Sequence, residues 1–543
     1  MNSLPLWIVL SPLSGAVLLS LLAYTRARPW VGNLSPLGVL PPLLFVAVLL
    51  PRVMQDGQVV YIPGAWSALK GIPLVVDGLS IIMAGLGSGL GLLVLLYAIG
   101  ERSYEPRYYA LVLLLITGML SVFLSGDLFN IYVGMEILSI ASYILIAYHK
   151  GQRALLASIT YLIISSMGLT LFLIGIAMLY QMTGTLNVHR IAANLPEQVT
   201  AHPARIALCA VFLLPNACIK AAIVPVHTWL ADAHSEAPTP VSALLSGIMI
   251  KVGIYLIIRI AGLFNLPSIH VLLLWTGALT ALVGAIVALC QNDMKRILAH
   301  SSISQIGYIA LAFGAGTRLS VVGALYHLIN HAFFKSLLFL SVGAVAHQTG
   351  SRDVRQLRGL GRQMPFIALT CTVGALSISG IPPFNGYMSK ALIMDALTHH
   401  PIPAFLLTLS GLGTIASFTK LTRIFYGAGP PLHHKRVSPW MNAPMLILML
   451  CCVTLGLAPN ASVLFLSRLM HVGPIETIQF WSIKKGGHTL LSIALGLLLY
   501  HVVIHKVPHW AHAIRNVRMA VDLKLMVLIA YVISMAILFR VLL

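Results

Sequence analysis

The sequence predicts an all-α protein that crosses a membrane many times, and two observations carry this prediction. Of the 543 residues, 58% are apolar and only 9% are charged, whereas a soluble domain carries charge on about a quarter of its residues. Apolar stretches near the roughly 20 residues that cross a bilayer as a helix recur along the whole chain. Lipid must therefore surround most of these side chains, and helices can satisfy their own backbone groups there.

Sixteen apolar runs are long enough to be membrane spans. The first run lacks the basic start of a cleaved signal and is expected to be retained. Because sixteen is even, both ends of the chain should lie on the same side of the membrane. The predicted spans are 4–24, 33–51, 78–98, 108–125, 128–148, 154–182, 205–223, 241–261, 270–290, 297–315, 318–346, 364–398, 401–424, 442–466, 488–505 and 523–542.

The basic residues between the spans orient them. Loops on one side of the predicted arrangement hold 19 Lys and Arg residues, and loops on the other side hold 9. Since loops rich in Lys and Arg stay in the cytoplasm, we expect both termini outside, in a bacterial plasma membrane. The formal charge of +20 reflects this orientation and not nucleic-acid binding, because the cations are scattered through short loops instead of forming a phosphate-binding patch.

Few charges fall inside the predicted spans, and most of them are lysines. A charge at the bilayer centre costs about 2.5–3.5 kcal/mol on the mildest insertion scale, so such residues are functional by default. For Lys420 a structural role is as reasonable as a functional one. The charged residues within spans are Lys220, Lys251, Lys335, Lys390, Lys420, Glu136 and Asp395.

Proline interrupts two of the spans that carry these lysines. Lys220 lies between Pro215 and Pro225, and Lys390 ends the segment "SGIPPFNGYMSK". Because proline removes a donor and frees a carbonyl that lipid cannot satisfy, both breaks should line a hydrated interior. The breaks lie five spans apart, which indicates two repeats, spans 4–8 and 9–13, of opposite orientation because five is odd.

The segment "YHLINHAFFKSLLFL" places His327, His331 and Lys335 four residues apart on one helix face. A zinc site is disfavoured, because Leu328 stands where a metalloprotease helix has its glutamate and no third ligand is near. Packed histidines with satisfied ring nitrogens are a second interpretation. We favour a proton relay, since titratable groups inside spans usually mark an ion pathway.

Glu136 lies nine residues after Asp127, about 13 Å further along a helix. Asp127 fits a helix cap or an interface residue. An unpaired carboxylate near mid-membrane is unfavourable, so we expect Glu136 to pair with a base, and Lys220 is the candidate. A glutamate in a hydrated lumen without a partner is the alternative. Desolvation favours the neutral amine of a lysine, so a carboxylate that approaches or withdraws would switch its proton.

The sequence shows no motif for a cofactor, a metal or hydrolytic chemistry. There is no Gly-rich phosphate loop and no nucleophile elbow, and the six cysteines lack CxxC spacing. Asp232, His234 and Glu236 are expected to order a polar turn among Gly and Pro signals. We therefore expect no nicotinamide, flavin, haem, quinone or metal site, and no redox activity from this chain alone.

Five phrases resemble the antiporter-like subunits of respiratory complex I and of Mrp-type sodium/proton antiporters. The resemblance covers about residues 77–400, and the second phrase is close to diagnostic. The phrases are "GDLFNIYVGMEILSIASY", "CIKAAIVPVHTWLADAHSEAPTPVSALLSG", "NDMKRILAHSSISQIGYIALA", "HLINHAFFKSLLFL" and "SGIPPFNGYMSK".

This resemblance implies a fold and a set of site residues. The fold is a core of fourteen helices with two inverted five-helix repeats and broken helices 7 and 12, followed here by about two extra helices. Lysines on both the eighth and twelfth helices are most similar to the D-type Mrp subunit and to subunits of membrane-bound hydrogenases. By helix, the implied site residues are Glu136 on helix 5, Lys220 on helix 7, Lys251 on helix 8, His327, His331 and Lys335 on helix 11, and Lys390 on helix 12.

Together these features predict four segments: 1–107, the repeats 108–261 and 262–424, and 425–543. They predict a subunit that translocates protons, with or without sodium exchange, beside other integral membrane subunits of a larger complex. The host could be an Mrp antiporter, an NADH-quinone oxidoreductase or a membrane-bound hydrogenase. A non-transporting subunit that anchors a redox or transport partner and a solute transporter acting alone are the alternatives.

Overall fold

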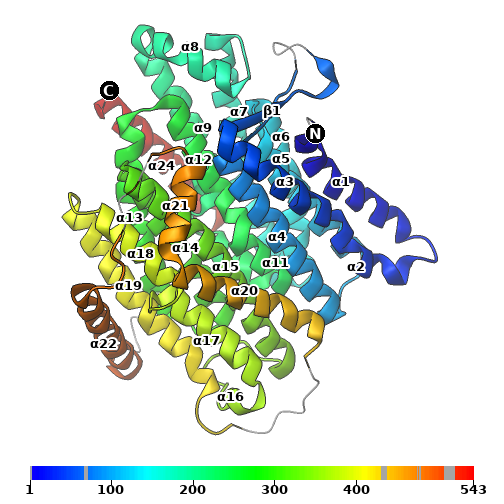
Figure 1. Ribbon diagram of the computed structural model, residues 1–543, viewed down its shortest axis with the longest axis vertical. Helices are drawn as coiled ribbons and strands as arrows, with labels where there is room; N and C mark the ends of the chain where they lie inside the picture. Colours follow the sequence, from blue (N-terminus) through cyan, green and yellow to red (C-terminus); the bar gives the residue numbers. More distant parts are fainter. Residues whose placement is uncertain are drawn as a thin grey trace.

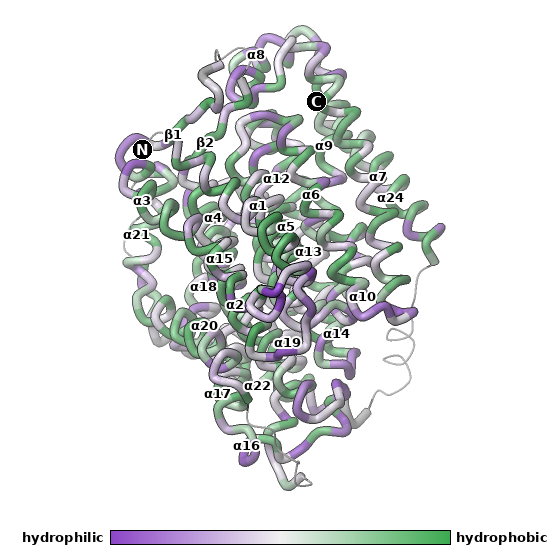
Figure 2. Tube along the Cα trace, turned by 90° about the vertical axis from the view of Figure 1, so that its right-hand side faces the viewer, coloured by the Kyte–Doolittle hydropathy of each residue, from purple (hydrophilic) through white to green (hydrophobic). Residues whose placement is uncertain are grey.

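The computed structural model describes residues 3–66, 71–429, 437–473, 475, 478–506 and 520–542. Long helices run side by side through it (Figure 1), and hydrophilic segments gather toward its two ends, around α8 and α16 (Figure 2). Among the described residues, fourteen helices are long and apolar enough to cross a membrane. The chain is an integral membrane protein, as its composition predicts.

The N-terminal part consists of helices and one small hairpin. Its strands β1 (Gln58–Tyr61) and β2 (Leu74–Asp77) are antiparallel. The hairpin was not predicted, because strands of four residues are much shorter than the apolar runs that indicate membrane spans. The helices are α1 (Leu4–Leu22), η1 (Arg28–Trp30), α2 (Val31–Leu34), η2 (Ser35–Gly38), α3 (Leu40–Asp56), η3 (Pro63–Ala65) and α4 (Gly78–Glu101).

Two blocks of helices follow, and their long helices come in the same order. The first block comprises α5 (Pro106–Leu124), α6 (Leu128–Ile146), α7 (Gln152–Thr183), α8 (Val188–Ala201), α9 (Pro203–Ala221), α10 (Leu230–Glu236), α11 (Thr239–Leu244), the π-helical turn η4 (Leu245–Met249) and α12 (Ile250–Phe264). The second comprises α13 (Pro267–Cys290), α14 (Met294–Gly314), α15 (Arg318–Thr349), α16 (Leu360–Gln363), α17 (Pro365–Ser379), α18 (Asn385–Ala396), α19 (Pro401–Thr422) and η5 (Arg423–Phe425).

A spacing of 166 residues relates the two blocks from α6 and α14 to the ends of α7 and α15. It separates Asp127 from Asp293, which cap α6 and α14, and it carries the β-bridge Asp127–Asn187 onto Asp293–Asp353. The helices α7 and α15 both have 32 residues. The segments that follow them, α8 and α16, lie at opposite ends of the molecule (Figure 1). The blocks are therefore repeats of inverted orientation, as the two breaks predict.

Both predicted breaks are present. Residues 222–229 separate α9 from α10, and residues 380–384 separate α17 from α18. Each helix before a break ends on a residue in the left-handed region, Ala222 (φ 54°) and Gly380 (φ 74°), whose N–H donates to a carbonyl of the last turn. This αL ending satisfies carbonyls that the interruption would leave free.

Four described helices complete the chain: α20 (Pro439–Leu457), α21 (Pro459–Leu469), α22 (Ile483–Lys506) and α24 (Val521–Leu542). The single predicted span 442–466 is wrong, because proline at 459 lacks a donor and moves Ala458 out of the helical region. In contrast, α22 and α24 match the two expected extra helices. The outer ends of α1 and α24 lie at the same end of the molecule (Figures 1 and 2).

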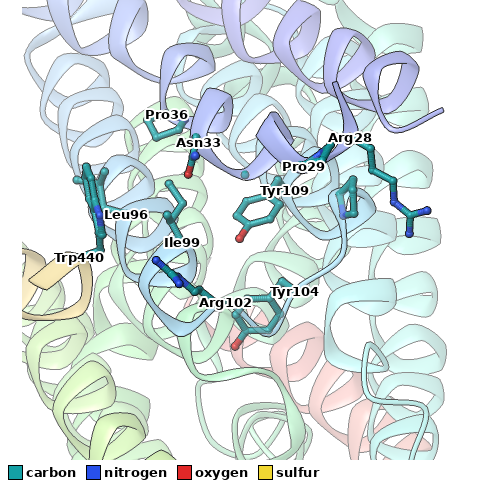
Figure 3. Close-up of a pocket in the computed structure, with 12 residues that line it drawn as sticks. Arg28, Pro29, Asn33, Pro36, Leu96, Ile99, Arg102, Tyr104, Tyr109 and Trp440 are labelled. Carbon is teal, nitrogen blue, oxygen red and sulfur yellow. The ribbon is translucent and has the colours of Figure 1, made fainter. Parts of the chain in front are cut away.

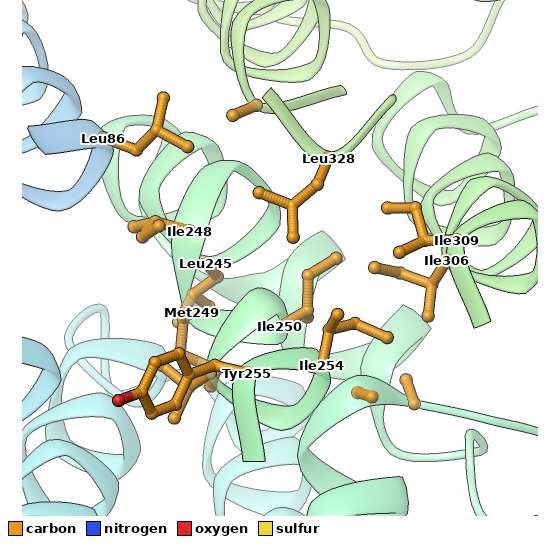
Figure 4. Close-up of a cluster of buried hydrophobic side chains, with 14 of the residues drawn as sticks. Leu86, Leu245, Ile248, Met249, Ile250, Ile254, Tyr255, Ile306, Ile309 and Leu328 are labelled. Carbon is orange, nitrogen blue, oxygen red and sulfur yellow. The ribbon is translucent and has the colours of Figure 1, made fainter. Parts of the chain in front are cut away.

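An apolar cluster fills the centre, where α11, η4 and α12 meet α4, α14 and α15 (Figure 4). Ile250 and Ile254 of α12 lie toward Ile306, Ile309 and Leu328. All five side chains are fully buried. A charged residue at this depth depends on the few polar groups within reach.

Candidate functional site

Lys220 lies in the last turn of α9, next to the first break, and its side chain is fully buried. Its Nζ donates to Ser139 Oγ (2.6 Å), Tyr161 OH (3.0 Å) and Ser165 Oγ (2.8 Å). The ring of Tyr161 stacks on Trp229 with centroids 4.0 Å apart, which fixes the hydroxyl. Three hydroxyl oxygens thus replace the water that an ammonium group would otherwise bind.

Glu136 does not contact Lys220, so the expected direct ion pair is wrong. Its Oε1 accepts a hydrogen bond from Tyr132 OH (3.2 Å), and its side chain is half-buried. An ammonium group has three N–H donors, and hydroxyls already take all three of Lys220. Any influence of the carboxylate on Lys220 is therefore electrostatic and acts across a distance. Asp127 is the predicted cap, because its carboxylate accepts from Asn130 N (2.9 Å).

Lys251 and His331 form the closest pair of titratable groups in the predicted set. Lys251 Nζ lies 2.6 Å from His331 Nδ1 and 2.7 Å from the Ser246 carbonyl oxygen. Both side chains are fully buried. The lysine follows the π-helical turn η4, an irregularity that often occurs at functional sites. An ammonium would donate to Nδ1 and an imidazolium would donate to the amine, so a single proton can move between them.

His327 is held by two polar side chains. Its Nε2 lies 3.0 Å from Gln305 Oε1, and its Nδ1 lies 2.9 Å from Ser389 Oγ. Because a carboxamide oxygen only accepts, Nε2 donates to it, and in the neutral ring Nδ1 accepts from the serine hydroxyl. The rings of His327 and His331 are 6.4 Å apart. The two histidines therefore face a common space, as their spacing predicts.

Lys335 and Lys420 bind backbone and hydroxyl oxygens. Lys335 Nζ donates to the Leu298 carbonyl (2.8 Å) and to Ser301 Oγ (2.5 Å), one turn beyond the Lys251–His331 pair. Lys420 Nζ donates to two carbonyl groups at the end of α13. These carbonyls have no partner within their own helix, so the Lys420 contacts are those of a structural residue.

Lys390 lies on α18, just after the second break. Its Nζ donates to the Ile378 carbonyl (2.6 Å) and lies 4.9 Å from the centroid of the Tyr308 ring. The same ring is 5.7 Å from the ring of His327. Tyr308 therefore joins Lys390 to the histidine row.

A cavity of about 390 Å³ lies against Lys390, between α18, α19 and α22. Its polar lining includes Tyr308, Lys390, Asp395, Lys485 and His488. This volume is large compared with the roughly 30 Å³ that one water occupies in the liquid. The second lysine therefore borders space that water can fill.

Another cavity, of about 930 Å³, lies between α2, η2, α4, α5 and the start of α20 (Figure 3). Arg28, Arg102, Tyr104, Tyr109 and Trp440 are among the residues that line it. None of the predicted site residues does, so it is not part of the candidate site.

Several polar partners at the site were not predicted. Around Lys220 they are Ser139, Tyr161 and Ser165, and around His327 they include Gln305 and Tyr308. Hydroxyls are common in spans and give no signal alone. The spacing of 166 residues between the repeats does give a signal, because Ser139, Tyr161 and Ser165 correspond to Gln305, His327 and His331.

Residues 125–416 match the family model described as "NADH:quinone oxidoreductase/Mrp antiporter, TM". The chain belongs to this family. The N subunit of the NADH-quinone oxidoreductase of Desulforudis audaxviator is 38% identical over 71% of this chain and 79% of its own length. The D subunit of the Na(+)/H(+) antiporter of Alkalihalophilus pseudofirmus is 34% identical over 78% and 86%.

The fold agrees with this membership. A chain in the structure of the Mrp complex from Dietzia sp. DQ12-45-1b superposes with a TM-score of 0.78 and 25% identity, covering 95% of this chain and 99% of that chain. The resemblance carried by the five sequence phrases is confirmed, and so is the all-α membrane fold.

Proposed function

We propose that this chain is a proton-translocating subunit of a multisubunit membrane complex. The protons move along an axis of titratable side chains that begins near the first break and ends at the second. The axis comprises Glu136, Lys220, Lys251, His327, His331, Lys335 and Lys390. Its partners are other integral membrane subunits, as relatives named as subunits of an NADH-quinone oxidoreductase and a Na(+)/H(+) antiporter suggest.

The series of contacts that runs from Lys251 of the first repeat into the second repeat supports this function best. Lys251 lies against His331, the ring of His331 faces His327, and Tyr308 lies between His327 and Lys390. A purely structural subunit has no use for a row of buried bases, since each is costly to bury unless a proton must be held there.

The chemistry of each step is a proton transfer between neighbouring bases. At Lys251, an N–H bond of the ammonium breaks as an N–H bond forms at His331 Nδ1, which leaves a neutral amine and an imidazolium. Once the Ser389 hydroxyl turns away from His327 Nδ1, that nitrogen takes the Nε2 proton of the His331 imidazolium, and the His331 ring returns to its neutral form. Imidazole suits this role because it takes and releases protons near neutral pH.

We further propose the segments 1–107, 108–261, 262–424 and 425–543 as functional divisions of the chain. The two central segments are the repeats that carry the axis. The excess of basic residues in one set of loops supports a bacterial plasma membrane location with both termini outside.

The function is tested by replacing Glu136, which is proposed to act on Lys220 without a direct contact. We expect Glu136→Ala to abolish formation of a pH gradient in vesicles that contain the assembled complex, because the field that acts on Lys220 is lost. Glu197→Ala, which removes an exposed glutamate of α8, should leave the gradient unchanged. Normal translocation in Glu136→Ala would contradict the proposed axis and favour a subunit that only anchors its partners.

Exchange of sodium for protons is a second candidate, and the relative named as part of a Na(+)/H(+) antiporter favours it. Copurification from native membranes separates the hosts: iron–sulfur or hydrogenase subunits would indicate a redox-driven pump, and small Mrp-type subunits an antiporter. A sodium-dependent pH change in vesicles that hold the purified complex would then establish the exchange.

A further inference from the structure

The C-terminal helix α22 contributes polar side chains to the cavity beside Lys390. The helix lies along α19 at the edge of the molecule (Figure 1). Lys485 in its first turn and His488 three residues later both line the cavity. Because α22 follows the last helices of the inverted repeats, its side chains are not part of the predicted axis.

An ion pair joins α22 to the broken helix. Lys485 Nζ lies 2.7 Å from Asp395 Oδ2, and the two side chains are 28% and 35% exposed. Lys485 is near the start of α22, and Asp395 is the second-to-last residue of α18. The pair therefore lies at the ends of two helices, while Lys390 lies more than one turn further inside α18.

The start of α22 is also fixed to α18 by Tyr387. Its hydroxyl donates to the Phe480 carbonyl (3.1 Å), and its ring lies 6.0 Å from that of Trp481. These contacts keep the beginning of α22 in place when the ion pair separates. Only the side chains of the pair need to move.

We propose that Asp395 and Lys485 form a gate on the cavity through which Lys390 exchanges protons with the outer aqueous phase. The proposal rests on the proposed function and adds to it the gating residues and the helix that supplies one of them. An ion pair that is partly exposed contributes little stability, so it can open and close readily.

The charges explain how such a gate would act on Lys390. With the pair closed, the carboxylate and the ammonium at the mouth neutralise each other. When Lys485 turns away, the Asp395 carboxylate is left alone in the cavity that Lys390 also lines, and it attracts the proton that Lys390 carries. Separation of the ion pair therefore opens the cavity and attracts the Lys390 proton toward Asp395 at the same time.

The gate is tested by chemical access to the cavity. Lys390→Cys in the assembled complex should react with a membrane-impermeant thiol reagent added outside, above the baseline of the six native cysteines. Adding Lys485→Gln should accelerate this reaction about fivefold, the upper range of what one partly exposed ion pair contributes. Arg355→Gln, which breaks the exposed Arg355–Asp353 pair (2.6 Å), is the matched control and should change nothing.

Charge reversal sharpens the test. Asp395→Lys combined with Lys485→Asp should restore the slow reaction, because the pair is rebuilt in the opposite sense. An equal rate with and without Lys485→Gln would overturn the gate, and so would a cysteine that reacts only from the inner side or not at all. If Lys390→Cys prevents assembly, Ser492→Cys reports on the same cavity.

The measurement does not depend on translocation. A gated reaction in a complex that moves no protons would contradict the proposed function and leave the gate intact. An ungated reaction in a complex that loses translocation with Glu136→Ala would contradict the gate alone.

Discussion

The two broken helices place their lysines in different surroundings. Lys220 is fully buried and ringed by three hydroxyls, whereas Lys390 is partly exposed and lines a cavity. Counted back from the left-handed residues Ala222 and Gly380, Lys220 corresponds to Ile378. The carbonyl of Ile378 accepts the hydrogen bond of Lys390. Lys390 therefore reaches, from the opposite side of its break, the backbone of the residue that corresponds to Lys220.

The residues that correspond between the two repeats differ in what they can do with a proton. In the first repeat the equivalent positions are Tyr161 and Ser165, whose hydroxyls hold an ammonium but do not take its proton at neutral pH. In the second repeat the same positions are His327 and His331, which do. Inverted repeats thus give one fold twice: hydroxyls surround Lys220 in the first repeat (the sealed site), and a series of bases leads toward the Lys390 cavity in the second (the open series). Under the proposed function the sealed site holds a proton and the open series passes it on.

The largest expected effect is at the sealed site. Lys220→Met should stop translocation while the complex still assembles, because methionine suits apolar packing and carries no proton. Lys220→Arg should also lose most activity, since a guanidinium does not release its proton and its planar fork does not match three converging hydroxyls. The measurement is a pH-gradient assay in vesicles with expression checked by blot. Full activity in Lys220→Arg would show that this residue supplies only a fixed positive charge. The two sites would then not differ in holding and passing a proton.

A smaller loss is expected in the open series. His331→Gln should lower the translocation rate about 100-fold, the lower range of what a general acid–base residue contributes, because Lys251 loses its proton acceptor. His347→Gln removes an exposed histidine of the same helix and should have no such effect. An unchanged rate in His331→Gln would mean that the proton bypasses the histidines.

Removing single hydroxyls around Lys220 should have a graded effect. Ser165→Ala and Tyr161→Phe each delete one hydrogen bond to a charged group, worth about 1.5–3 kcal/mol. We expect each to slow translocation by roughly tenfold, which corresponds to the lower end of this range, measured in the same vesicles. Rates that match the unmodified chain in both variants would show that the ring of hydroxyls does not set the state of Lys220.

The smallest effect concerns the backbone at the breaks. Gly380→Ala should destabilise the complex by at least about 1 kcal/mol, because a side chain in the left-handed region is unfavourable and its Cβ would lie 3.1 Å from Lys390 Cδ. Ala222→Gly should be neutral or slightly stabilising, since that strain is already present. Thermal unfolding in detergent measures both. Equal shifts in the same direction would contradict the equivalence of the two breaks.

The sequence predicted the features that depend on local chemistry. Hydropathy gave most of the spans, the prolines at 225 and 383 marked the breaks, and the scarcity of charge inside the spans singled out Lys220, Lys251 and the histidine row. The cap at Asp127 was predicted for the same reason. Each of these signals comes from residues within a few turns of one another.

Only the tertiary structure decided which groups meet. Ser139, Tyr161 and Ser165 lie 81, 59 and 55 residues from Lys220, so no local pattern connects them, and the glutamate chosen as its partner binds a tyrosine instead. The pairing of Lys485 with Asp395 likewise follows from how α22 packs along α19. The sequence by itself determined where charge enters the membrane, because the free-energy cost of burying a charge depends on the residue and its position along the span. Which partner offsets that cost depends on helix packing, because the donors and acceptors come from different helices.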